Sequence, residues 1–152
     1  MIVDTIKNED ISELVAFIRT YKSEQNKQIT EIQTNKIKDE IFQIINNNTN
    51  SYGFKCINES KKIIGYIILH IINFPMLCGK ELYISDLFVD NKDRGKGIGK
   101  KLLSFAEDIA VKNKCERLIL NNPKEYESYK RSFYSKFGFV ERIEFANFIK
   151  NL

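Results

Sequence analysis

The fold is decided by one stretch of sequence, Leu82-Tyr83-Ile84-Ser85-Asp86-Leu87-Phe88-Val89-Asp90-Asn91-Lys92-Asp93-Arg94-Gly95-Lys96-Gly97-Ile98-Gly99-Lys100-Lys101-Leu102-Leu103. An apolar, β-prone run leads into a charged turn, a glycine-rich loop and then an amphipathic helix. Gly95, Gly97 and Gly99 leave the backbone N–H groups unhindered at the start of that helix, where unpaired donors and the helix dipole favour anions. The sequence therefore predicts an anion-binding loop beside a cleft that the rest of the chain shapes.

Length and composition favour one globular domain, residues 1–152. The chain has 152 residues, of which 43% are hydrophobic and 29% charged, enough for a core and a soluble surface. No apolar run approaches the length of about 18 residues that a membrane helix needs. The start, Met1-Ile2-Val3-Asp4, lacks the basic-then-apolar order of a signal peptide. We expect a cytoplasmic protein that does not bind membranes.

The cysteines and the single histidine provide no metal site. Cys56, Cys78 and Cys115 form no CxxC pair, and with one histidine there is no set of zinc ligands. Scattered cysteines in odd number fit a reducing cytosol. We expect no metal cofactor, and we interpret His70 as a structural residue of a long strand.

The net charge of +4 is concentrated around the glycine loop. The segment 92–101 holds five basic residues and one acidic residue, Asp93. Elsewhere the signs are mixed and there is no long basic tract, so a small polyanion explains the clustering better than a nucleic acid does. We expect no nucleic-acid partner.

Periodicity predicts alternating strands and helices. The apolar spacing of Ile98, Leu102, Phe105 and Ile109 predicts a helix over 98–113. Expected strands are 2–7, 51–58, 62–74, 81–90, 116–120 and 139–149, and the other expected helices begin near 8–10 and cover 30–46 and 124–136. This order predicts an α/β or α+β fold, a mixed sheet covered by helices.

Two common glycine loops do not fit this spacing. A P-loop requires Gly-x4-Gly-Lys-Ser/Thr, but Arg94 stands five residues before Gly99 and Lys101 takes the place of the hydroxyl residue. A Rossmann fingerprint requires Gly-x-Gly-x-x-Gly at the opening of the domain, and here the spacing is one residue short and three strands come first.

The pattern Arg94-x-x-Gly97-x-Gly99 resembles the acyl-CoA-binding motif of the GNAT N-acetyltransferase superfamily. The segment Asp86-Leu87-Phe88-Val89 before it, and Phe133-Tyr134-x-x-x-Gly138-Phe139 after it, follow that family's order and separations. The resemblance implies the GNAT fold, with a mixed central sheet of six to seven strands and about four helices. It also implies acetyl transfer from acetyl-CoA to a primary amine of a small molecule or peptide, directly within a ternary complex.

The resemblance also implies site residues. The pyrophosphate of acetyl-CoA is expected on the loop, and the pantetheine arm on the strand before it, where backbone groups can pair with it. The implied cofactor-binding residues are Leu87, Phe88, Val89, Arg94, Gly95, Lys96, Gly97, Ile98, Gly99 and Lys100. Tyr134 matches the tyrosine that many members use as the acid for the departing thiolate.

The base that deprotonates the amine is left open by the sequence. Some members carry an acidic residue directly before the Asp-Leu-Phe-Val segment, and here that position is Ser85. Asp86, Glu81 or a water held by Ser85 are the alternatives. In the helix before Tyr134, Glu127 replaces an asparagine that often contacts the cofactor, so contacts from this helix are not assigned.

Two other functional classes stay open. One is a non-catalytic module that binds or senses acyl-CoA, since Ser85 departs from the acidic pattern. The other is a nucleic-acid-binding protein that uses the basic segment 92–101. A homodimer is a common arrangement in the family, although no sequence feature here demands one.

Overall fold

The computed structural model describes residues 1–47 and 49–151, which divide into two compact units. The first unit is Met1–Leu120 and the second is Asn121–Leu152. No helix in the described part of the chain combines the length and the apolar character needed to cross a membrane.

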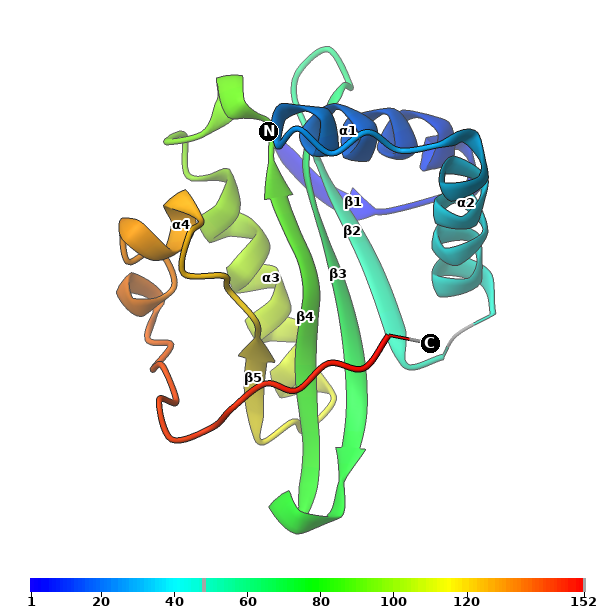
Figure 1. The fold of residues 1–152 in the computed structure, drawn as a ribbon. Coiled ribbons are helices and arrows are strands. Elements are labelled where there is room, and N and C mark those ends of the chain that lie inside the picture. Colours follow the sequence, from blue (N-terminus) through cyan, green and yellow to red (C-terminus); the bar gives the residue numbers. More distant parts are fainter. Residues whose placement is uncertain (48, 152) are drawn as a thin grey trace. The chain divides into compact units, whose positions relative to one another are not determined.

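The first unit is built on a five-stranded sheet (Figure 1). Its strands are β1 (Ile2–Thr5), β2 (Ser51–Ile57), β3 (Ile63–Phe74), β4 (Gly79–Val89) and β5 (Arg117–Leu120), and they lie side by side in that order. The first four strands are antiparallel neighbours, and β5 runs parallel to β4. The sheet is therefore mixed, as predicted.

The helices of the first unit are α1 (Ile11–Glu24), α2 (Glu31–Asn46) and α3 (Ile98–Lys112). Thr30 caps α2, because its hydroxyl accepts a hydrogen bond from the N–H of Gln33 at 3.2 Å. The helix that was predicted from the apolar stripe after the glycine loop is α3. In Figure 1, α1 and α2 lie on one side of the strands and α3 lies on the other.

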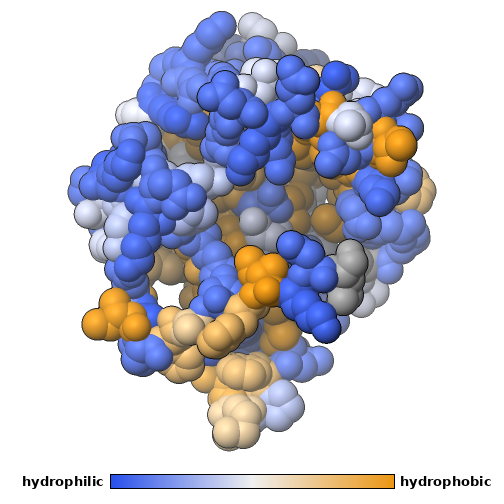
Figure 2. All heavy atoms as spheres, viewed as in Figure 1, coloured by the Kyte–Doolittle hydropathy of each residue, from blue (hydrophilic) through white to orange (hydrophobic). Residues whose placement is uncertain are grey.

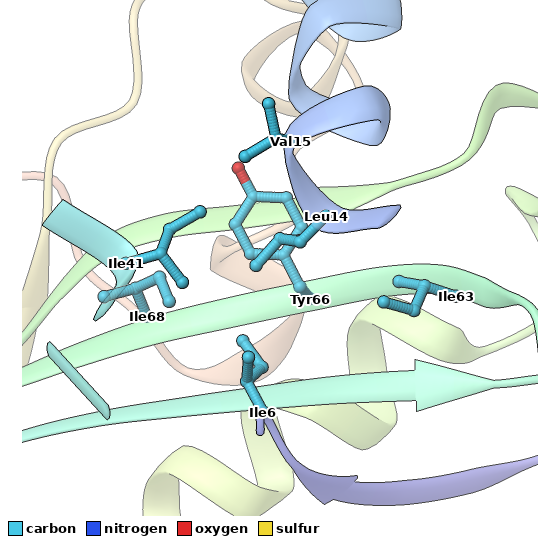
Figure 3. Close-up of a cluster of buried hydrophobic side chains, with 7 residues drawn as sticks. All are labelled: Ile6, Leu14, Val15, Ile41, Ile63, Tyr66 and Ile68. Carbon is cyan, nitrogen blue, oxygen red and sulfur yellow. The ribbon is translucent and has the colours of Figure 1, made fainter. Parts of the chain in front are cut away.

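Two layers of side chains bury the two faces of the sheet. Between α1, α2 and the sheet lies a cluster (Figure 3) made of Ile6, Leu14, Val15, Ile41, Ile63, Tyr66 and Ile68. On the other face α3 buries Ile98, Leu102, Leu103, Ala106 and Ala110. Because side chains alternate along a strand, His70 shares the face of Tyr66 and Ile68, toward α1 and α2.

The second unit contains less regular structure than the sequence predicted. In place of a helix over 124–136 there are α4 (Glu127–Lys130) and a 3-10 turn, η4 (Ser135–Phe137). Ser132 has a φ of 54°, in the left-handed region, and the N–H of Phe133 donates to the carbonyl of Ser128 at 2.8 Å. Such a left-handed residue ends a helix, so the single long helix was a wrong prediction.

The predicted strand over 139–149 is absent from the described residues, so the expectation of six to seven strands is not confirmed. Residues 140–150 are all exposed, and none of them is paired in the sheet. β-prone residues form a strand when they pack against a partner strand, and propensity alone does not supply one.

The far end of the β3–β4 hairpin exposes apolar side chains. Ile72, Phe74 and Met76 are 41%, 37% and 88% exposed. Figure 2 shows this hairpin end as an apolar tip, at the bottom of the view, on a surface that is otherwise mostly hydrophilic. The predicted homodimer stays a prediction.

Candidate active site

A β-bulge in β4 places Ser85 outside the regular pairing of the sheet. Ile68 of β3 lies opposite Asp86, and the next residue, Leu69, lies opposite Ile84. Ser85 is therefore the extra residue, and its side chain is exposed. Bulges redirect side chains and often lie next to active sites.

At the same point β4 loses its other neighbour. The pairing of β4 with β5 ends at Ile84, opposite Leu120, whereas β4 itself continues to Val89. On the β5 side, within the described residues, no strand pairs with Ser85 to Val89. The strand thus presents an open row of backbone donors and acceptors, which an extended ligand can pair with.

The side chains along this open edge pack into the sheet. Phe88 lies 5.5 Å from Tyr66 and 4.1 Å from Tyr21 between ring centroids. Leu87, Phe88 and Val89 are all half-buried. Packing therefore holds these side chains in the protein, while backbone groups on the side away from β3 stay available to a ligand.

The glycine loop leads directly from this edge into α3. Gly95 and Gly97 have φ values of 78° and 81°, in the left-handed region, and Gly97 is the N-cap residue, directly before α3. A Cβ at either position would meet no atom within 4 Å. Glycine is therefore required here by backbone conformation rather than by crowding within the protein.

The N-terminus of α3 has no side-chain cap and no acidic residue in its first turn. The first bond that closes the helix runs from the N–H of Lys101 to the carbonyl of Gly97 at 3.0 Å. The N–H groups of Ile98, Gly99 and Lys100 precede it and belong to the donors that a helix start leaves without an intrahelical acceptor. Together with the dipole, they form a binding site suited to an anion.

The charged side chains of the loop have different local partners. The Nε of Arg94 donates to the carbonyl of Val89 at 3.2 Å, which ties the loop to the end of β4. Lys96 pairs with Asp93 at 2.7 Å, and the Nζ of Lys101 donates to the carbonyl of Met1 at 2.9 Å. Lys96 and Lys100 are exposed and close to the helix start in sequence.

Gly65 fixes how closely α3 approaches the sheet. A Cβ at this position of β3 would lie 2.9 Å from the carbonyl oxygen of Phe88 and 3.1 Å from Cγ2 of Ile98. Ile98 is 1% exposed and opens α3. The absence of a side chain at Gly65 thus lets the first turn of α3 rest against the open strand.

A row of hydrogen bonds crosses the sheet beside the bulge. Oγ of Ser51 lies 2.7 Å from Nδ1 of His70, and Nε2 of His70 lies 3.0 Å from Oγ of Ser85. Ser85 also donates to Oδ2 of Asp86 at 2.8 Å. The structure thus brings together Ser85 and Asp86, both predicted, with two residues that the sequence did not assign to the site.

Burial and charge act in opposite directions on His70. Burial lowers the pKa of His70 below its ordinary 6.5, and the negative charge of Asp86 opposes that shift. The lowered pKa favours the neutral imidazole at pH 7. Glu81, another alternative for the base, instead pairs with Arg117 at 2.8 Å.

Tyr134 belongs to the second unit, where aromatic side chains surround it. Its ring centroid lies 5.0 Å from that of Phe133 and 5.7 Å from that of Phe139, both in edge-on contact. Tyr134 directly precedes η4, and Gly138, with a φ of 82°, ends it. Arg131 stacks over Phe133 with 5.1 Å between the guanidinium carbon and the ring centroid.

Comparison with known proteins identifies the family. The model of the acetyltransferase (GNAT) family matches residues 16–139. The chain belongs to the GNAT acetyltransferase family.

Individual relatives match only parts of their own length. The chain is 35% identical over 96 residues to an uncharacterized N-acetyltransferase, YhfO, of Bacillus subtilis, and the match covers 62% of each of the two chains. It is 38% identical over 61 residues to the glucosamine 6-phosphate N-acetyltransferase of Arabidopsis thaliana, covering 40% of this chain and 38% of the relative. The chain thus spans less than two thirds of these relatives.

A solved structure described as that of a probable acetyltransferase has a similar fold along the whole chain. Its TM-score is 0.83 at 15% identity, and the match covers 100% of this chain and 98% of the other. The five-stranded mixed sheet and its helices are therefore a GNAT-like fold.

Proposed function

We propose that this protein is an N-acetyltransferase that transfers the acetyl group of acetyl-CoA directly to a primary amine. The observation that carries the proposal is the open edge of β4, which runs from the bulge at Ser85 into the uncapped N-terminus of α3. One continuous surface thus offers backbone partners for an extended arm and donors for an anion. Acetyl-CoA has both parts, and GNAT proteins generally use it.

The pyrophosphate of acetyl-CoA fits the loop of 94–100. The positive φ angles of Gly95 and Gly97 expose the loop backbone, and no acidic side chain stands in the first turn of α3 to repel a phosphate. Lys100 is exposed and adds positive charge nearby, whereas the charge of the exposed Lys96 is offset by its ion pair with Asp93. Arg94 shapes the loop through its bond to Val89.

The pantetheine arm fits the open edge of β4. Its amide groups are donors and acceptors like those of a peptide, so they suit the backbone groups of 87–89 that face away from β3, such as those of Leu87. The carbonyl of Val89 already accepts a hydrogen bond from Nε of Arg94. This placement leads the thioester toward the bulge at Ser85. The acceptor amine then belongs near Ser85, on the face that α1 and α2 cover.

Two of the three cysteines are poorly suited to forming an acyl-enzyme, and the third, the exposed Cys78, directly precedes β4, at the end of the strand away from the bulge. Cys56 is 0% exposed, and burial raises the pKa of its thiol above 9.0. Burial likewise raises the pKa of Cys115. A thiol that is buried or resists ionisation is a poor nucleophile, so direct attack by the amine is the simpler route.

The reaction needs two proton movements. The amine must lose a proton to become nucleophilic, and the departing CoA thiolate must gain one. We propose Tyr134 as the acid that protonates the thiolate, from its match to the family pattern. We propose that the cluster of Ser85 and Asp86 lies at the amine.

The experiment is a binding titration followed by an acceptor screen. Isothermal calorimetry of the whole chain with acetyl-CoA should give saturable binding, whereas no binding at ordinary salt would overturn the proposal. Release of CoA thiol is then measured with glucosamine 6-phosphate, a polyamine, an amino acid, an aminoglycoside and a peptide with a free N-terminus. Binding without release for any amine would favour a sensing module.

A further inference from the structure

The row Ser51–His70–Ser85–Asp86 joins three elements at the bulge. Ser51 begins β2, His70 lies in β3, and Ser85 and Asp86 lie in β4. Both ring nitrogens of His70 have a hydroxyl partner, at 2.7 Å and 3.0 Å.

The two hydroxyls allow the imidazole to hold its proton on either nitrogen. Ser85 has one hydroxyl proton, so a hydrogen bond donated to Asp86 and one donated to Nε2 of His70 exclude each other. While Ser85 donates to Asp86, the ring carries its proton on Nε2 and donates to Ser85, and Nδ1 accepts from Ser51. With the proton on Nδ1, the ring donates to Ser51, and Nε2 accepts from a Ser85 hydroxyl that has turned away from Asp86. Ser51 is 7% exposed, so this hydroxyl is held inside the protein. The ring is therefore oriented from behind, and Nε2 points to Ser85.

Ser85 is the member of the row that a ligand can reach. Its side chain is exposed, whereas His70 and Asp86 are half-buried and Ser51 is buried. The bulge aims Ser85 away from the regular strand, at the point where β4 leaves β5. A proton from outside can therefore arrive at the Ser85 hydroxyl.

Burial and the charge of Asp86 act in opposite directions on a proton carried by the ring. Asp86 supplies the negative charge that acts on His70, and the Tyr83 ring stacks beside it at 6.4 Å between centroids. Burial favours the neutral ring, which is the form that accepts a proton at pH 7. Asp86 then offsets the charge of the imidazolium.

We propose that His70, acting through the hydroxyl of Ser85, receives the proton that the acceptor amine loses. The inference rests on the proposed acetyltransferase function and supplies the base that Ser85 itself cannot be. The transfer starts from the ring with its proton on Nδ1 and with the Ser85 hydroxyl turned from Asp86 to Nε2 of His70. The ammonium N–H bond breaks, and its proton binds Oγ of Ser85 as the original hydroxyl proton moves to Nε2. The products are a neutral amine, an intact serine and an imidazolium beside the Asp86 carboxylate.

The first test uses the fact that His70 is the only histidine in the chain. The imidazole of uniformly labelled protein gives one set of NMR signals, so its pKa and tautomer can be followed by titration without any acceptor. We expect a pKa below 6.5, a further decrease in Asp86→Asn, and a changed tautomer balance in Ser85→Ala. If the pKa and the tautomer balance of His70 in both variants equal those of the wild type, the inference is overturned.

The second test is the pH profile of turnover. With the fastest amine of the screen, kcat/KM of the wild type should fall on the acid side with the pKa measured by NMR. His70→Gln should remove that limb and lower kcat about 10²-fold, within the range typical of general base catalysis, and Ser85→Ala should do the same. Ser85→Thr, which keeps the hydroxyl, is the matched control and should retain most activity.

The two proposals fail in different ways. An intact acid limb and wild-type rates in His70→Gln would overturn the role of His70 while leaving the acetyltransferase proposal in place. Absence of acetyl-CoA binding in the wild type would overturn the acetyltransferase proposal, and the proton route with it.

Discussion

Replacing Gly97 with alanine tests whether the loop backbone holds the cofactor. Gly97 has φ 81° and ψ 3°, and its Cβ would meet no atom within 4 Å, so the only cost within the protein is conformational. A left-handed alanine costs about 1–2 kcal/mol, and the stiffer unfolded chain returns about 0.4–1 kcal/mol. The expected net loss of stability is therefore about 1 kcal/mol, or about 2–4 °C in Tm for a chain of this size.

The effect on cofactor binding should be larger than this loss. The added methyl group occupies the open space through which a phosphate would approach the N–H groups of α3. A hydrogen bond to a charged group contributes about 1.5–3 kcal/mol, so losing one weakens acetyl-CoA binding roughly 10- to 150-fold. Calorimetry measures this Kd directly, with thermal unfolding as the parallel measurement.

Gly138 provides a matched control. Its φ is 82° and its Cβ would also meet no atom within 4 Å, but it lies outside the loop. Gly138→Ala should carry the same conformational cost and leave the Kd of acetyl-CoA unchanged. If Gly97→Ala binds acetyl-CoA as tightly as the wild type, the reasoning about the loop is refuted.

Four further predictions test the frame of the site and its chemistry. Asp10→Asn removes the carboxylate that pairs with the ammonium of Lys55, a residue that is only 6% exposed. The free energy of unfolding in urea should fall by about 3–5 kcal/mol, and adding Lys55→Met should recover most of it. A change within about 0.5 kcal/mol would contradict this. Gly65→Ala should lower the free energy of unfolding by about 1–3 kcal/mol and weaken acetyl-CoA binding, because Phe88 or Ile98 must move. Wild-type stability and wild-type binding would show that the close packing at Gly65 does not position α3. Tyr134→Phe should lower kcat about 10²-fold or more without changing the Kd of acetyl-CoA, and a wild-type kcat would exclude it as the acid. Because folding lowers the pKa of His70, the unfolded chain binds more protons, and the free energy of unfolding should fall as the pH drops below 6.5. His70→Gln should remove that part of the fall. An unchanged dependence of stability on pH in this variant would be the contrary result.

The central stretch was predictable because local sequence and global fold agree there. The apolar stripe of α3 fixes both its extent and its buried face, and the alternate glycines mark the left-handed residues before it. The strand before the loop was equally predictable from its apolar run. These features depend on near neighbours in the sequence.

The C-terminal predictions depended on contacts that the sequence does not reveal. Residues 124–136 have helical composition, but the left-handed Ser132 interrupts them. The apolar residues within 139–149 predicted a strand, yet a strand also requires a partner. The intrinsic propensities of the residues in these two segments therefore did not determine their secondary structure.

The proton route was hidden from sequence reasoning for a geometric reason. Ser51 lies 19 residues before His70, and the two meet only through the antiparallel register of β2 and β3. The bulge that turns Ser85 toward the ring is likewise a property of strand pairing. The one available signal was a single polar histidine in a long apolar strand, and it fits a structural role equally well.

An NMR titration of the backbone amides with acetyl-CoA tests most directly whether the cofactor binds along the glycine loop and the edge of β4. The N–H signals of Gly95, Gly97, Gly99 and Lys100 should shift strongly and saturate together with the binding isotherm. Pantetheine, which lacks the pyrophosphate, should shift the signals of Leu87 to Val89 and leave those of the loop nearly unchanged. If the loop amide signals do not move at saturating acetyl-CoA, the glycine loop does not bind the pyrophosphate.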